Sequence, residues 1–118
     1  MIQSFRDLEV YQESYQLAIE MYQISRSYPQ EERYGLRSQI QRASVSIPLN
    51  IAEGYGKQES AAEFKRYLRM ALGSANEIEV LLDLSRDLGY LEANKCAELQ
   101  ERYITTRKRL YRLAEHWH

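Results

Sequence analysis

Residues 39–56 read Gln39-Ile-Gln-Arg-Ala-Ser-Val-Ser-Ile-Pro-Leu-Asn-Ile-Ala-Glu-Gly-Tyr-Gly56, and this segment is the most informative part of the 118-residue chain. Apolar side chains recur in it at steps of three and four residues, the spacing that places them on one side of an α-helix. They are Ile40, Ala43, Ile47 and Ile51. The stretch therefore predicts an amphipathic helix that packs its apolar side against other helices.

A polar stripe runs beside the apolar one on the same predicted helix. It consists of Gln39, Arg42, Ser46, Asn50 and Glu53. Pro48 also lies inside this helix, where it cannot donate to the carbonyl of Ser44, and such a proline costs about 3 kcal/mol unless a kink absorbs it. We interpret the polar stripe as architectural, with its groups bonding one another or a neighbouring subunit. A ligand or RNA site is the alternative.

The flanking sequence predicts a helix on each side of this one. Residues 8–28 carry a broad apolar face, which should touch more than one neighbour, and Pro29 ends that helix. The second helix runs from about Tyr34 to Glu53 and ends at Gly54-Tyr55-Gly56, where we expect a glycine in the left-handed cap conformation. The third begins at Ser60, whose spacing to Glu63 is that of a capping box, and ends near residue 89.

A fourth helix follows the turn at residues 90–91. Its apolar row is Cys96, Leu99, Tyr103, Thr106, Leu110, Leu113 and Trp117. Gly73 sits inside the third helix at a cost of about 1 kcal/mol relative to alanine, so we expect another helix to approach closely there. Antiparallel packing would place Arg42 opposite Gly73, Ser74 and Glu77, and Glu77 then offers Arg42 a carboxylate. Four such helices with short connections predict an all-α, antiparallel up-down-up-down four-helix bundle, formed by residues 1–118 as a single domain.

Composition excludes several classes of protein. The chain has one cysteine and therefore no internal disulfide, and its N-terminal residues lack the apolar run of a signal peptide. Its longest weakly polar stretch, residues 43–52, is too short to span a bilayer. We expect a cytoplasmic protein that does not contact membranes.

Positive charge is concentrated in the fourth helix, although the whole chain has a formal net charge of −1. Residues 91–118 hold six Lys and Arg residues against four Asp and Glu residues. The candidate RNA-binding residues are Lys95, Arg102, Arg107, Lys108, Arg109 and Arg112. Lys95, Arg102, Arg109 and His116 repeat every seven residues, so they could follow a phosphate backbone, with Tyr103 or Tyr111 stacking on bases. The alternative is ion pairing with the acidic residues of the third helix, namely Glu59, Glu63, Glu79, Asp83 and Asp87.

The C-terminus allows a weak enzymatic alternative. Arg109 or Arg112 with His116 or His118 has the loose spacing of metal-independent helical ribonucleases of the HEPN class. Both histidines lie on the last turn, where a helix frays and catalytic geometry is poorly held. No further ligands at convincing spacing accompany the two histidines, so we expect no metal and no other cofactor. Cys96 and Tyr103 are expected in the core.

Over nearly its whole length the chain resembles the 23S ribosomal RNA intervening-sequence proteins, a family of four-helix bundles. The matching residues are Phe5-Arg-Asp-Leu8 with Tyr11 and Tyr22, Tyr28-Pro29 with Glu32, Gln39-Ile40 with Arg42-Ala43, Ser46-Ile-Pro-Leu-Asn-Ile-Ala-Glu-Gly54, Phe64 with Leu68, and Ala71-Leu-Gly-Ser-Ala75 with Glu77. The string Asn50-Ile-Ala-Glu-Gly54 is the specific part. The resemblance implies a ring-like homopentamer without an established enzymatic activity.

These observations favour a self-assembling, non-enzymatic scaffold whose partners are further copies of itself and RNA. We predict no small-molecule substrate. Gln39, Arg42, Ser46, Asn50, Glu53 and Glu77 would hold the oligomer contact. The alternatives are the HEPN-like ribonuclease and an accessory protein of a diversity-generating retroelement, a distant relation that helps a reverse transcriptase handle RNA.

Overall fold

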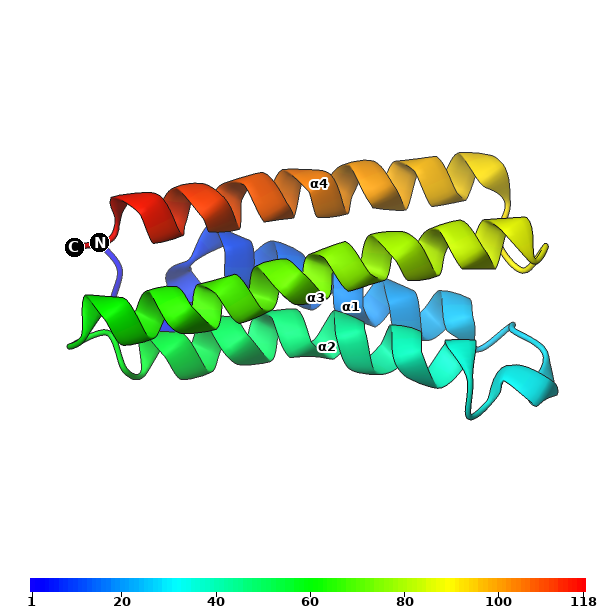
Figure 1. Ribbon diagram of the computed structural model, residues 1–118, viewed down its shortest axis with the longest axis horizontal. Coiled ribbons are helices and arrows are strands. Elements are labelled where there is room, and N and C mark those ends of the chain that lie inside the picture. The colour runs from blue at the N-terminus through cyan, green and yellow to red at the C-terminus, as the bar shows by residue number, and fades with distance from the viewer.

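The computed structural model describes residues 1–118 and consists of helices and their connections. The elements are η1 (Phe5–Asp7), α1 (Glu9–Ser25), η2 (Gln30–Glu32), α2 (Leu36–Tyr55), α3 (Ala61–Asp87) and α4 (Ala93–His116). Successive α-helices run antiparallel along the long axis, and both termini lie at the same end of the bundle (Figure 1). The predicted all-α up-down-up-down bundle is confirmed.

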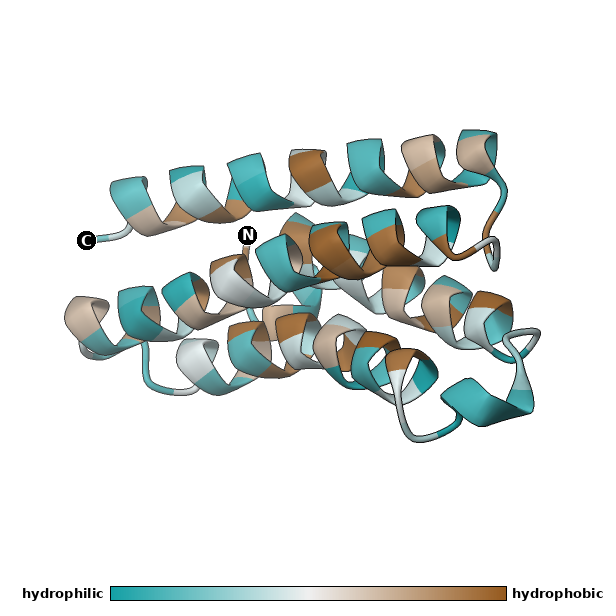
Figure 2. Ribbon diagram, turned by 45° about the vertical axis from the view of Figure 1, so that its right-hand side comes forward, coloured by the Kyte–Doolittle hydropathy of each residue, from teal (hydrophilic) through white to brown (hydrophobic).

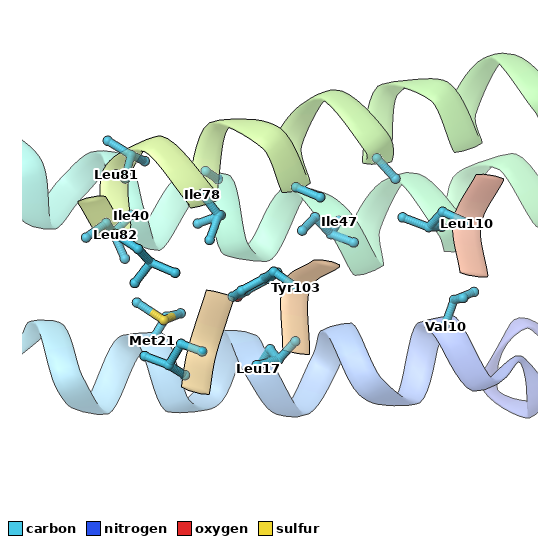
Figure 3. Packing of buried hydrophobic residues seen from close by; sticks show 14 of the residues in the cluster. Val10, Leu17, Met21, Ile40, Ile47, Ile78, Leu81, Leu82, Tyr103 and Leu110 are labelled. Atoms are coloured by element: carbon cyan, nitrogen blue, oxygen red, sulfur yellow. The ribbon is translucent and has the colours of Figure 1, made fainter. Parts of the chain in front are cut away.

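The helices form a ring of neighbours around one core. The backbone of α1 lies close to that of α2, α2 to α3, α3 to α4 and α4 back to α1, whereas the two diagonal pairs have no such close backbone approach. The largest fully buried side chains are Tyr103, Phe64, Leu17, Met21, Ile40, Ile47, Ile51, Leu68, Ile78, Leu82, Leu99 and Leu110. All four helices supply them, so the core comes from the apolar stripes that the three-and-four spacing predicts (Figure 3).

Two helix boundaries follow from local chemistry. The Ser60 hydroxyl accepts a hydrogen bond from the backbone N–H of Glu63 at 3.2 Å, which confirms the predicted start of α3. The Glu63 carboxylate pairs with Arg66 at 3.0 Å, and no hydrogen bond returns from it to the backbone of Ser60. Only half of the predicted capping box therefore forms. At the other end of α3, Gly89 has a φ of +83° and lets the chain turn into α4.

The predicted left-handed glycine cap of α2 was wrong, because the cap residue Gly56 has a right-handed φ of −63° and Gly54 lies inside the helix. Gly54 is instead needed for helix packing, because a Cβ atom there would lie 2.6 Å from Cβ of Tyr67 and 3.0 Å from Cδ1 of Phe64. The absent side chain allows α2 and α3 to meet closely at this point.

Gly73 shows the opposite situation. No atom lies within 4 Å of the position that its Cβ would take, so the predicted close approach of a second helix of the same chain was wrong. Gly73 lies on the exposed side of α3, away from the core. The conformational cost of this glycine has no compensation inside the bundle.

A carboxylate closes the end of the bundle opposite the termini. Helix α1 stops at Ser25, three residues before the predicted end, although Tyr28 is still buried. Beyond it, one oxygen of Glu32 accepts the backbone N–H of Leu36 at 3.0 Å, and the other accepts the Tyr90 hydroxyl at 2.9 Å. Glu32 thus caps the start of α2 and ties it to the turn between α3 and α4.

Candidate nucleic-acid interface and assembly surfaces

Three of the predicted RNA-binding cations lie on the side of α4 that faces α1, and acidic residues of α1 pair with each of them. Arg102 binds the Glu20 carboxylate through two nitrogens at 2.9 and 2.5 Å. Arg109 pairs with Glu13 and, at 3.2 Å, with Glu9. Lys95 lies 3.9 Å from Glu20 and 3.3 Å from Glu98. Charge on this side of α4 is therefore balanced within the chain.

The ion pair between Arg102 and Glu20 is the best defined of this set. Hydrogen bonding to Arg102 is the largest cause of the lowered pKa of Glu20. The same hydrogen bonds raise the pKa of Arg102. Ion pairing was the alternative reading of the basic residues, but the partner helix differs from the expected one. Lys95, Arg102 and Arg109 turn to α1, and only Arg107 reaches α3, with its Nε 3.6 Å from the Glu79 carboxylate.

Lys108 lies on the other side of α4, next to α3, and Arg112 lies between the two sides, because it also lines a groove with Glu9 and Arg109. Lys108 and Arg112 line a groove of about 640 Å³ together with Leu72, Asn76, Arg107, Tyr111, Glu115 and His116. A second groove of about 410 Å³ continues past Tyr111 and is lined by Lys65, Arg69, Leu72, Tyr111, Ala114 and Glu115. We call Lys65, Arg69, Lys108 and Arg112, arranged around Tyr111, the basic face.

The four cations of the basic face have no ion pair or side-chain hydrogen bond within the chain, in contrast to Lys95, Arg102 and Arg109. Glu115 is the single carboxylate that lines either groove. The Tyr111 ring stands between them and is 62% exposed. This face therefore presents uncompensated positive charge beside an accessible aromatic ring.

Sequence reasoning missed Lys65 and Arg69. Both lie in α3, where the acidic residues outnumber the basic ones, so the segment as a whole gave no basic signal. Their i, i+4 spacing was the available clue, because two like charges at that spacing lie on one side of a helix. Antiparallel pairing of α3 with α4 brings this pair level with Lys108 and Arg112.

The polar stripe of α2 lies at the boundary with α3 and is not buried in the bundle. Ser46 bonds the Ser74 hydroxyl at 2.5 Å, and the Asn50 side chain donates to the carbonyl of Ser46 at 2.8 Å. The other members, Gln39, Arg42 and Glu53, are exposed and have no side-chain partner in the chain, and the same holds for Glu77. Arg42 thus does not form the expected pair with Glu77.

An apolar groove of about 490 Å³ separates α1 from α2 on the outside of the bundle. It is lined by Phe5, Tyr11, Tyr15, Ala18, Ile19, Tyr22, Gln23, Arg26, Val45, Pro48, Leu49 and Ala52. Tyr15, Ile19 and Leu49 are each 40–54% exposed. The apolar face of α1 is thus broader than the core covers, and Pro48 belongs to the wall of this α1–α2 groove.

A second apolar surface follows the outside of α3. Met70, Val80, Leu84 and Leu88 are exposed by 45–58% and recur at helical spacing with Gly73 among them. We call these five residues the α3 row. The row lies beside the polar stripe of α2, because Ser74 of α3 bonds Ser46 of α2, and it shares no residue with the α1–α2 groove.

The structure places two of the groups proposed for catalysis, Arg112 and His116, in one groove. Arg109 is paired with carboxylates of α1, whereas Arg112 and His116 line the groove on the α3 side. His118 follows the last helical residue and is exposed. Cys96 and Tyr103 are buried in the core, as predicted, and burial raises the pKa of both side chains.

Comparison with known proteins agrees with this architecture. Residues 6–112 match the family model described as 23S rRNA-intervening sequence protein. A crystal structure of a protein of unknown function from the S23 ribosomal protein family of Bacteroides thetaiotaomicron VPI-5482 superposes with a TM-score of 0.81 and 25% sequence identity, covering 90% of this chain and 95% of that chain. No curated protein matches significantly. None of the helices combines the length and the apolar character needed to cross a bilayer.

Proposed function

The chain belongs to the 23S rRNA-intervening sequence protein family, and on that premise we propose that it is a non-enzymatic cytoplasmic scaffold that assembles with itself, as a homopentamer, and contacts RNA. One observation supports self-assembly above all. The bundle exposes two apolar surfaces, the α1–α2 groove and the α3 row, which lie on different helices. A surface of this kind on a soluble protein marks a contact site.

Two different surfaces on one chain favour a ring over a symmetric dimer. If the α3 row of one copy enters the α1–α2 groove of the next, every copy uses both surfaces and the contact is heterologous, which closes into a ring when the rotation permits. Gly73 then allows the neighbouring subunit to approach. The exposed Arg42, Glu53 and Glu77 border the same contact and supply charges that would fix its register.

We expect single charges placed on either surface to dissociate the assembly. Leu49→Glu in the α1–α2 groove and Leu84→Glu in the α3 row each bury an unpaired carboxylate in the proposed contact, which a modest interface does not tolerate. Sedimentation velocity should give a particle of five times the 14.0 kDa chain mass for the wild type and a monomer for both variants. Tyr34→Glu is the control, because Tyr34 is 86% exposed and lies outside both surfaces.

Mixing the two dissociated variants tests the heterologous geometry. Each variant retains one intact surface, so a 1:1 mixture should form one good contact and stop at a dimer. A wild-type monomer would contradict self-assembly. A mixture that stays monomeric would contradict the pairing of the groove with the row.

The positions of Arg109 and His118 support a non-enzymatic role, whereas Arg112 and His116 share a groove, so that pair has to be tested directly. Arg109 is held by glutamates, and His118 lies beyond the end of α4. We expect a labelled RNA incubated without metal to remain intact on a denaturing gel. Cleavage that disappears in the His116→Ala, His118→Ala double variant would contradict this and favour the ribonuclease.

A further inference from the structure

We propose that the basic face between α3 and α4 binds single-stranded nucleic acid, with its cations on the phosphates and Tyr111 against a base. This inference rests on the RNA contact in the proposed function and places it at different residues from the heptad series of α4. It would supply that function with a ligand class.

The cations of α3 and α4 differ in whether a carboxylate of the chain already pairs with them. Lys95, Arg102 and Arg109 already neutralise carboxylates of α1, so a phosphate would have to displace Glu20, Glu13 or Glu9 to reach them. Lys65, Arg69, Lys108 and Arg112 form no ion pair, and of these four only Arg112 shares a groove with one of those carboxylates, Glu9. Binding of a phosphate at these residues releases counterions without breaking an internal ion pair.

The shape of the basic face suits an extended strand. Two grooves of about 640 and 410 Å³ share Leu72, Tyr111 and Glu115, so they adjoin at the Tyr111 ring. A strand that follows both grooves passes cations of α4 on one side of the ring and cations of α3 on the other. Glu115 repels phosphate at the centre, where a base rather than a phosphate would lie.

The exposed ring of Tyr111 distinguishes between kinds of polyanion. An acidic peptide would use the cations but would gain nothing from an exposed aromatic ring. Unpaired bases stack on such a ring whatever their sequence, whereas the bases of a duplex are already stacked on each other. The combination of four free cations with Tyr111 therefore favours a single strand over a duplex or an acidic protein.

The site shares no residue with the proposed assembly surfaces. No residue of the α3 row lines either groove of the basic face, although Arg69 lies one helical turn from Gly73 of that row. The α1–α2 groove includes no residue of α3 or α4. Each copy in an assembly would therefore keep Lys108, Arg112 and Tyr111 of α4 accessible, and a long strand could contact several copies.

The experiment measures binding of fluorescent 20-nucleotide single-stranded RNA and single-stranded DNA by anisotropy, with a duplex and poly-glutamate as competitors. For four phosphates the logarithm of affinity should fall with the logarithm of salt at a slope of about −3, a loss of roughly 50-fold between 50 and 200 mM salt. The RNA and DNA arms identify which strand is preferred. Single strands should compete better than the duplex and poly-glutamate.

Two pairs of variants give the test its control. Lys108→Gln with Arg112→Gln should weaken binding and reduce the salt slope by about 1.4. Arg86→Gln with Lys95→Gln also removes two positive charges, but from residues that are ion-paired elsewhere, and should change affinity less than about twofold. Tyr111→Ala should cost roughly tenfold in affinity, and Tyr111→Phe should retain binding because the ring can still stack.

Equal losses in the two charge pairs, or full binding by Tyr111→Ala, would overturn the proposal. So would poly-glutamate competing as well as single strands. Sedimentation of the same variants without nucleic acid keeps this result separate from assembly. A monomer that binds in the expected way contradicts only the proposed ring, and an intact ring that ignores single strands contradicts only the basic face as a binding site.

Discussion

Replacing Gly54 by alanine will destabilise the protein by about 2 kcal/mol. The new methyl group would lie 2.6 Å from Cβ of Tyr67, an atom fixed close to the α3 backbone, so the two helices must move apart. Such overpacking costs about 3 kcal/mol at the upper end of its usual range, and the better helix propensity of alanine returns about 1 kcal/mol. Urea denaturation of the two proteins measures the difference.

Gly73→Ala is the matched control, since it makes the same substitution in the interior of the next helix. No atom lies near its Cβ position, so only the gain in helix propensity remains and stability should rise by about 1 kcal/mol. Both substitutions are best compared in the monomeric Leu84→Glu background, where assembly does not contribute. Equal effects at the two glycines would contradict the tight contact of α2 with α3.

Above pH 10 the protein will lose stability steeply because Tyr103 is buried. Its hydroxyl has no hydrogen-bond partner in the protein, and burial raises its pKa well above the usual value. Below pH 10 the native and unfolded chains both hold this proton. At higher pH only the unfolded chain releases it, so the free energy of unfolding falls by about 1.4 kcal/mol per pH unit from this residue.

Tyr103→Phe isolates that contribution. Removing an unpartnered buried hydroxyl should raise stability by about 1 kcal/mol at pH 7, and the advantage over wild type should grow by roughly 2–3 kcal/mol between pH 10 and 12. Tyr34→Phe provides the exposed control. Denaturation curves at each pH check this, and a constant difference between Tyr103→Phe and wild type would show that Tyr103 ionises in the native state.

The fold could be predicted from residue spacing, because four segments with a three-and-four repeat and short connections leave one simple way to bury their apolar stripes. Ser60 also marked the start of α3, since its cap depends on residues three apart. The role of Gly54 could not be predicted in the same way. A helix-terminal glycine and a glycine at a helix crossing look alike until the neighbouring helix is placed.

The basic residues show the same limit more clearly. The apolar row of α4 fixes which side of this helix faces the core, but it does not fix the handedness of the bundle, which decides whether Arg102 meets α1 or α3. Figure 2 shows that much of α4 is hydrophilic, so hydropathy does not distinguish the two flanks of its apolar row. The free cations could be recognised only after Glu20, Glu13 and Glu9 were seen to occupy the others.

Carboxylates of α1 pair with Arg102 and Arg109, and this dependence on ion pairs makes α1 the helix that separates most easily from the bundle. Between α1 and α4 lies a largely polar groove of about 470 Å³, bridged by these pairs. Dissolved ions screen them, and the stabilisation from Glu20, whose pKa is lowered, is lost as acid protonates it. Backbone amides of α1 should therefore exchange with deuterium sooner than those of α3 as ionic strength rises. Helix α1 also forms one wall of the groove proposed to receive the next subunit. Salt and pH would therefore change the rate of subunit exchange, because both change how often α1 opens away from α4.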